Sequence, residues 1–112
     1  MSDGIRARLQ GDLATAMKAR DRNRVAVLRS TLAAIANGEA IEAVAPASKV
    51  NKGLYSAEAE RRVLTEADVR EIVERERAEL LHAAGELQDH GEPGRAQELT
   101  TQAAILDGYL AG

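Results

Sequence analysis

The chain has 112 residues, which suits a single domain over 1–112 with one core. Hydrophobic residues make up 45% of it and charged residues 29%, a composition typical of globular rather than disordered proteins. It contains no cysteine, which excludes disulfides, thiol catalysis and cysteine-ligated metal sites. With no signal-peptide pattern and no run long enough to cross a membrane, we expect a cytoplasmic protein without a membrane partner.

The composition also favours helices. Phe and Trp are absent and only two tyrosines occur, while the apolar residues are mainly Ala, Leu, Val and Ile. Residues 3–19 are predicted to form a first helix, since Ile5 and Leu9 begin an apolar stripe at helical spacing. Asp21 then has the position of an N-cap, which predicts a second helix over 21–37.

The middle of the chain has a different character. Asn37-Gly38 is typical of a left-handed stop, so the second helix is expected to end there. Residues 39–64 are small or polar, lack sustained periodicity and include Pro46 and Gly53. This pattern predicts a long, mobile connection.

Two further helices are predicted in the last part of the chain. Thr65 can accept a hydrogen bond from the backbone N–H of Asp68 and so begin a helix over 66–90. Pro93 suits the first turn of a helix over 93–110. The short link between them favours an antiparallel hairpin. The predicted fold is all-α, a small bundle of about four helices in two antiparallel hairpins.

Five segments of the chain recur in an order and spacing that point to a known family. They are Leu-Ala-Thr-Ala-Met-Lys-Ala-Arg-Asp (13–21), Val-Leu-Arg-Ser-Thr-Leu-Ala-Ala-Ile-Ala-Asn-Gly-Glu (27–39), Leu-Thr-Glu-Ala-Asp-Val (64–69), Gly91 and the Ile-Leu-Asp-Gly-Tyr-Leu ending of 103–110. In this succession the chain resembles the GatB/YqeY family. This family includes YqeY-like proteins and the tail domain of the GatB subunit of tRNA-dependent amidotransferase, and its longer members add a second small helical unit that these residues lack. The resemblance implies a tRNA-associated accessory module, linked by family to carbon–nitrogen ligation with glutamine as amido-N-donor.

Charge is unevenly distributed. Residues 1–38 hold seven Lys/Arg and three Asp/Glu, a balance of +4, whereas residues 39–112 hold eight and fifteen, a balance of −7. A basic cluster at the first helix junction could contact a phosphate backbone, or could be a solvated face or pair with the acidic remainder. The scarcity of aromatic residues favours recognition of backbone and shape over base stacking. The cluster consists of Lys18, Arg20, Arg22, Arg24 and Arg29.

Two other groups of polar residues are candidates for structural or chemical roles. Glu76 interrupts the apolar stripe of the third helix. A carboxylate in such a seam could be a general base with a raised pKa, but the preferred interpretation is that it pairs with a cation, for which Arg29 is the candidate. His82, Glu86 and His90 share a helix face at metal-ligand spacing, but no second-shell partner is evident and a solvated face is the preferred interpretation. We predict neither a metal nor a cofactor.

No serine has a histidine or lysine in a recognisable motif, and no glycine-rich phosphate loop occurs. We therefore expect a chain without catalytic activity of its own. The expected partner is tRNA or an RNA-handling protein. The alternative is a protein-interaction or self-assembling bundle without an RNA role, and a homo-oligomer fits either interpretation.

Overall fold

A computed structural model describes the backbone of residues 4–49 and 63–111 and the side chains of 4–40 and 63–111. Over these ranges the chain is helical and has no strand, which confirms the all-α prediction. Part of the predicted mobile connection, residues 50–62, lies outside the described residues. The helices are α1 (Ile5–Ala19), α2 (Arg22–Lys49), α4 (Glu66–Asp89) and α5 (Pro93–Leu110).

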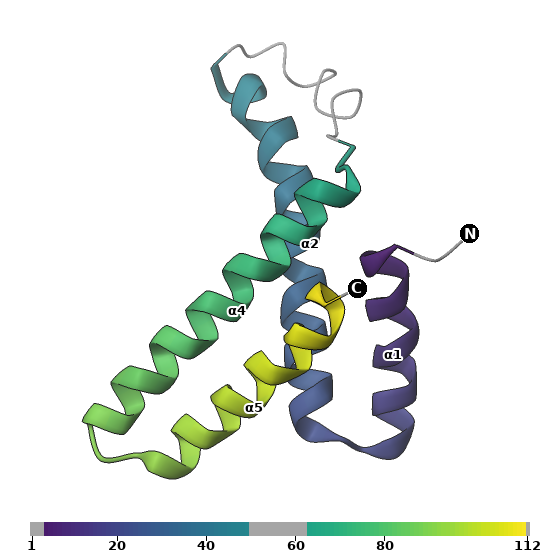
Figure 1. Cartoon of the computed structure of the whole chain (residues 1–112). Coiled ribbons are helices and arrows are strands. Elements are labelled where there is room, and N and C mark those ends of the chain that lie inside the picture. Colours follow the sequence, from purple (N-terminus) through teal and green to yellow (C-terminus); the bar gives the residue numbers. More distant parts are fainter. Residues whose placement is uncertain (1–3, 50–62, 112) are drawn as a thin grey trace.

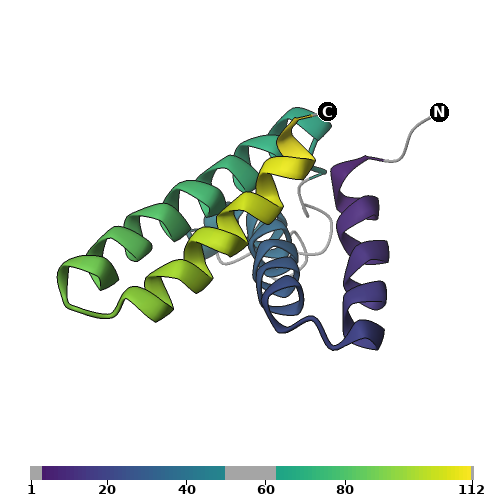
Figure 2. The ribbon, with the colours of Figure 1, turned by 60° about the horizontal axis from the view of Figure 1, so that its bottom comes forward.

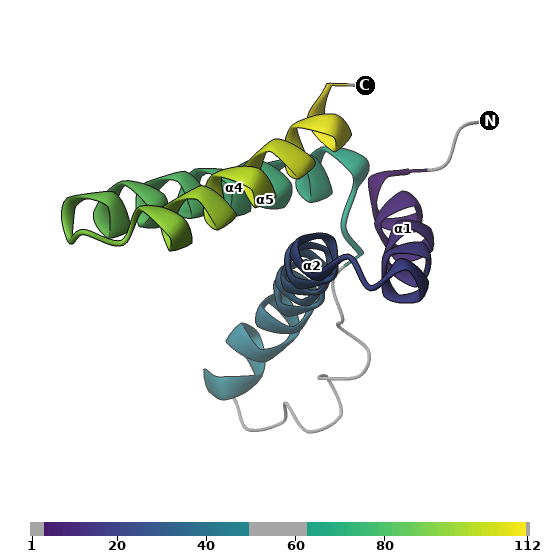
Figure 3. The ribbon, with the colours of Figure 1, turned by 90° about the horizontal axis from the view of Figure 1, so that it is seen from below.

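The helices form two hairpins that cross one another. Helices α1 and α2 run side by side in opposite directions, as do α4 and α5 (Figure 1). Figure 3 shows the α4–α5 pair as a layer lying across α2. The turn between α4 and α5 points away from α1 (Figure 2). Within the described helices, none is long and apolar enough to cross a membrane.

The core lies where the two hairpins cross, and every helix contributes to it. Leu9 of α1, Leu28 and Ile35 of α2, Val73 of α4 and Leu106 of α5 are all completely buried. Burying an aliphatic side chain of this size contributes roughly 1.5–3 kcal/mol. These contacts hold the two hairpins together where they cross.

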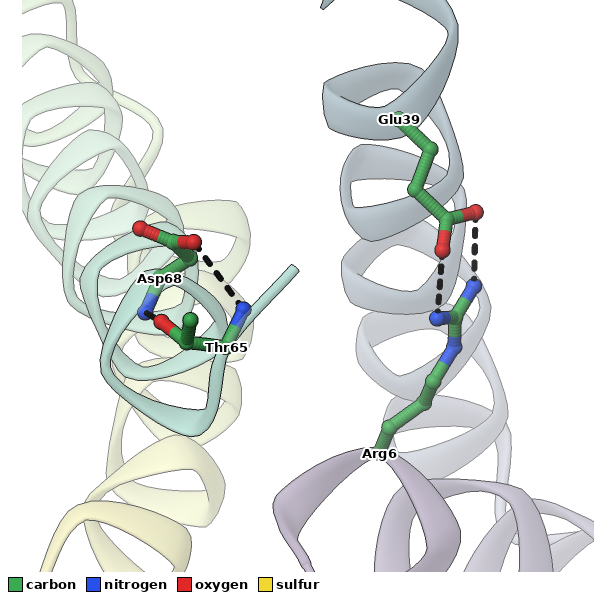
Figure 4. Close-up of polar contacts among 4 residues, drawn as sticks. All are labelled: Arg6, Glu39, Thr65 and Asp68. Atoms are coloured by element: carbon green, nitrogen blue, oxygen red, sulfur yellow. Dashed lines mark hydrogen bonds and ion pairs between the residues drawn. The ribbon is translucent and has the colours of Figure 1, made fainter. Parts of the chain in front are cut away.

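The predicted helix starts of α2 and α4 are confirmed. Asp21 accepts a hydrogen bond from the backbone N–H of Arg24 at 3.2 Å. The Thr65 hydroxyl accepts one from the N–H of Asp68 at 3.0 Å, and the Asp68 carboxylate accepts the N–H of Thr65 at 3.0 Å (Figure 4). This reciprocal pair is a capping box, which satisfies two N–H groups that a helix start otherwise leaves free.

The predicted stop at Asn37-Gly38 is wrong, because α2 continues to Lys49. A Cβ atom on Gly38 would lie 3.1 Å from Cδ1 of Ile72, so glycine allows α2 to pack closely against α4. Gly38 therefore allows two helices to come close together and does not form a left-handed turn. The following Glu39–Ala45 segment is rich in alanine, which propagates a helix readily.

Candidate nucleic-acid interface

The turn between α1 and α2 gathers three of the five predicted cations around one hollow. Arg20 lies in the turn, while Arg22 and Arg29 lie seven residues apart on the same face of α2. Together with Val25 and Ala26 they line an open hollow of about 340 Å³. Hereafter this is called the basic hollow. Its apolar floor was not predicted, although Val25 and Ala26 follow Arg22 at the i+3 and i+4 spacing that places residues on one helix face.

The other two cations of the cluster have different positions. Lys18 is in the last turn of α1 and does not line the basic hollow. Arg24 turns toward Asp21, with its Nε 3.4 Å from the carboxylate. Arg24 therefore has a local partner, and the cluster is divided into three cations at the hollow, one beside it and one that is paired.

The cations at the basic hollow are not neutralised by a direct ion pair among the described residues, although Arg22 and Ala26 also line a neighbouring hollow with Glu98 of α5. The side chains of Arg20, Arg22 and Arg29 are exposed and form no ion pair in the part of the chain that the structure describes. Elsewhere arginines do find carboxylates, as Arg6 does with Glu39 and Arg77 with Asp107. The hollow is thus a local excess of positive charge on a chain of net charge −3.

Arg20 occupies a backbone conformation that most residues avoid. Its φ is 58° and its ψ 39°, the left-handed region, and it is the only residue other than glycine with positive φ among those described. Helices commonly use glycine here, because a Cβ atom in this conformation costs about 1–2 kcal/mol. The backbone conformation at this position favours glycine, whereas the positive charge of the Arg20 side chain is favourable at the C-terminal end of α1.

The position of Arg22 is electrostatically unfavourable. This residue begins α2, whose first turn contains no acidic residue. The N-terminus of a helix carries a partial positive charge, and a like charge there is unfavourable by about 0.3–1 kcal/mol. Lys18 differs, since the C-terminal turn of α1 favours a cation. The charge of Arg22 therefore adds to the positive potential at the N-terminus of α2 instead of compensating it.

The opposite end of the α1–α2 hairpin is electrostatically matched. The guanidinium of Arg6 donates to both carboxylate oxygens of Glu39 at 2.8 and 3.0 Å (Figure 4), and these hydrogen bonds raise the pKa of Arg6. The first N–H of α1, at Ile5, donates to Glu66 at 3.0 Å. Arg70 donates to the carbonyl of Leu110 at 2.7 Å, at the C-terminal end of α5. At this end of the bundle, the N-terminus of α1 contacts an acidic side chain and the C-terminus of α5 contacts a basic one.

Tyr109 is the polar anchor between α5 and α1. Its ring is buried, its hydroxyl donates to the carboxylate of Asp12, and the guanidinium of Arg8 lies 5.0 Å from the ring centre. Burial raises the pKa of the Tyr109 phenol, and the hydrogen bond to Asp12 raises it further. With these partners satisfied within the fold, Tyr109 has a structural role.

The expected pair between Glu76 and Arg29 is not formed among the described residues. The Glu76 carboxylate accepts a hydrogen bond from the Ser30 hydroxyl at 3.1 Å. Glu76 is only half-buried and Arg29 is exposed at the basic hollow, so neither charge needs the other. The apolar pattern of the sequence predicts that Glu76 lies in the contact between two helices. The structure places it there beside Ser30 of α2, but solvent reaches this position.

The histidine face of α4 lies near the tip of the α4–α5 hairpin. His82 Nε2 lies 3.5 Å from the Glu86 carboxylate, and both side chains are more than half exposed. His90 Nδ1 contacts the backbone carbonyl of Glu86 at 2.7 Å rather than pointing to a shared centre. Among the described residues no group of three or more potential ligands could hold a metal ion.

Comparison with known proteins adds no relative. No family model, curated protein or solved structure matches this chain.

Proposed function

We propose that this protein is a non-catalytic, RNA-associated helical module that binds the phosphate backbone of tRNA at the basic hollow. The observation that supports this best is the convergence of Arg20, Arg22 and Arg29, without direct ion pairs among the described residues. Lys18 and the N-terminus of α2 add positive potential to the same end.

Phosphate is the anion that this arrangement suits. A guanidinium donates several hydrogen bonds in a fixed planar geometry that matches phosphate oxygens. The backbone conformation of Arg20 and the charge of Arg22 at a helix N-terminus are each unfavourable for stability, which favours a ligand over a solvated face. Because the rest of the chain is acidic, we expect weak binding that requires low salt.

The proposal includes the GatB/YqeY resemblance. In that reading the module serves a glutamine-dependent amidotransferase or a related system by holding RNA, while the chemistry belongs to other chains. The basic hollow supplies cations but no nucleophile with a positioned base.

Fluorescence anisotropy with labelled tRNA, titrated with salt, tests the proposal. Each neutralised phosphate changes the slope of log affinity against log salt by about −0.9 on B-form DNA and about −0.7 on a single strand, and we expect a change of this order on tRNA. The wild type is expected to bind at about 50 mM salt, where such contacts are strong. The double variant Arg22→Glu/Arg29→Glu should lose binding, or bind with a slope reduced by about two contacts.

Arg75→Glu/Arg95→Glu is the matched control. It makes the same change in net charge on two exposed arginines outside the cluster. It should bind tRNA nearly as well as the wild type, because neither residue lines the basic hollow. Equal loss in both variants would mean that only net charge matters. If the wild type fails to bind at low salt, the interaction-module alternative takes its place.

A further inference from the structure

We infer that the basic hollow accepts the base of an unpaired nucleotide, so that it selects RNA with a single-stranded end, bulge or loop over a continuous duplex. This inference rests on the proposed function and names the feature of RNA that the site recognises. The observation behind it is the floor of the hollow. Val25 and Ala26 form apolar surface directly between the three arginines.

A site for phosphate alone has no use for an apolar floor. Phosphate oxygens gain nothing from contact with Val25 or Ala26, and cations on a flat helix face would bind them equally well. Apolar surface beside a few polar groups is instead typical of a site for a small organic group, and here it lies in an open hollow. The volume of the hollow, about 340 Å³, lies at the lower end of such sites.

A nucleotide has chemical groups that suit both the arginines and the apolar floor of the hollow. Its base is flat and apolar on its faces, and its phosphate carries the negative charge. Arginine serves both, because a guanidinium plane can stack on a base and its edge can bind a phosphate. This supplies a stacking surface in a chain that has no Phe or Trp. In a continuous duplex the base faces are covered by their neighbours, so only an unpaired base can enter.

Three RNAs with the same duplex separate the contributions of base and phosphate. One is blunt-ended, the second has a three-nucleotide 3′ overhang, and the third has the same overhang without bases. The overhang duplex is expected to bind about tenfold more tightly than the blunt duplex, within the range for stacking of one or two bases. The abasic overhang should bind nearly as weakly as the blunt duplex, because it adds phosphates only.

Ala26→Gln tests the floor without changing charge. Ala26 is exposed on α2, so a longer polar side chain should fill the hollow while the helix stays folded. The variant should lose the preference for the overhang, so that the overhang duplex and the blunt duplex bind it with similar affinity, and an unchanged preference of about tenfold would contradict the inference. Gln10→Ala, an exposed change on α1 outside the hollow, should keep the preference.

The alternative outcomes are distinguishable. If all three RNAs bind equally and with steep salt dependence, the hollow is a phosphate site, which overturns this inference and leaves the proposed function standing. If no RNA binds, both fail. A labelled acidic peptide with a central leucine that competes for Arg22 and Arg29 and binds more tightly than the overhang RNA would overturn the inference in favour of a protein partner.

Discussion

The two ends of the α1–α2 hairpin differ in how their charges are satisfied. At one end, Arg6 pairs with Glu39 and the N–H of Ile5 finds Glu66. At the other, Arg20 and Arg22 stand without direct ion pairs among the described residues. Both ends are built from helix termini of the same bundle, so the contrast is not a consequence of the fold.

The contrast is clearest between the starts of α4 and α2. Helix α4 begins with a capping box and has Glu66 and Asp68 in its first turn, which is favourable for a helix N-terminus. Helix α2 begins with Asp21 as its cap and then places Arg22 and Arg24 in the first turn. The charges at the start of α4 stabilise that helix, whereas the arginines at the start of α2 are unfavourable for its stability. This difference supports the proposal that the α1–α2 turn binds a ligand.

The largest effect is expected at Gly38, where α2 packs closely against α4. Gly38→Leu should lower the free energy of unfolding by about 1–3 kcal/mol, because its side chain would overpack the contact with Ile72. Chemical denaturation measures the change. Gly11→Leu is the control, since nothing lies within 4 Å of a Cβ atom at Gly11. That variant should gain stability from helix propensity, and an equal loss in both would show that the close contact is not the cause.

Removing the cap of α4 should have the next largest effect. Thr65→Ala deletes the oxygen that accepts the Asp68 N–H and should cost about 1 kcal/mol. Thr15→Ala, on the exposed side of α1, removes a hydroxyl that bonds only to its own helix and should be neutral or slightly stabilising. Thermal unfolding of the two variants gives the comparison. A Thr65→Ala variant as stable as the wild type would mean that the start of α4 does not depend on its capping box.

At the basic end a substitution should raise the free energy of unfolding, whereas the two substitutions above lower it. Arg20→Gly is expected to raise the free energy of unfolding by about 0.5–1 kcal/mol, because glycine adopts the left-handed conformation without strain. The same substitution inside α2, Arg29→Gly, should instead lower it by about 1 kcal/mol through lost helix propensity. Denaturant midpoints separate the two. Loss of stability in Arg20→Gly would mean that the arginine side chain stabilises the turn.

Much of the fold could be predicted from local signals. Asp21, Thr65 and Pro93 each act on their own helix, so their positions in the sequence were enough to mark the starts of α2, α4 and α5. Gly38 could not be interpreted this way. Its role depends on Ile72 of another helix, and a glycine after asparagine resembles a helix end equally well.

The candidate site could be predicted only in part. The run of cations around the α1–α2 turn was visible in the sequence, and three of them meet at one hollow. The pairing of Glu76 could not be derived, because periodicity does not reveal how far solvent reaches into a helix seam. The Ser30 partner was missed for this reason. The unusual backbone of Arg20 had no local sequence signal either, since arginine rarely adopts it.

We propose that Arg22 lowers the stability of the free protein and contributes to RNA binding, and thermal unfolding with and without tRNA tests both effects directly. Arg22→Glu and its control Arg95→Glu each place an acid in the first turn of a helix, and each should melt a few degrees above the wild type without RNA. Arg95 lies in α5 outside the basic hollow. With tRNA at about a hundred times the dissociation constant, binding adds about 2.7 kcal/mol to a protein that retains its site. The wild type and Arg95→Glu should then rise well above Arg22→Glu. If Arg22→Glu still melts above the wild type when tRNA is present, Arg22 does not serve RNA and the claim is wrong.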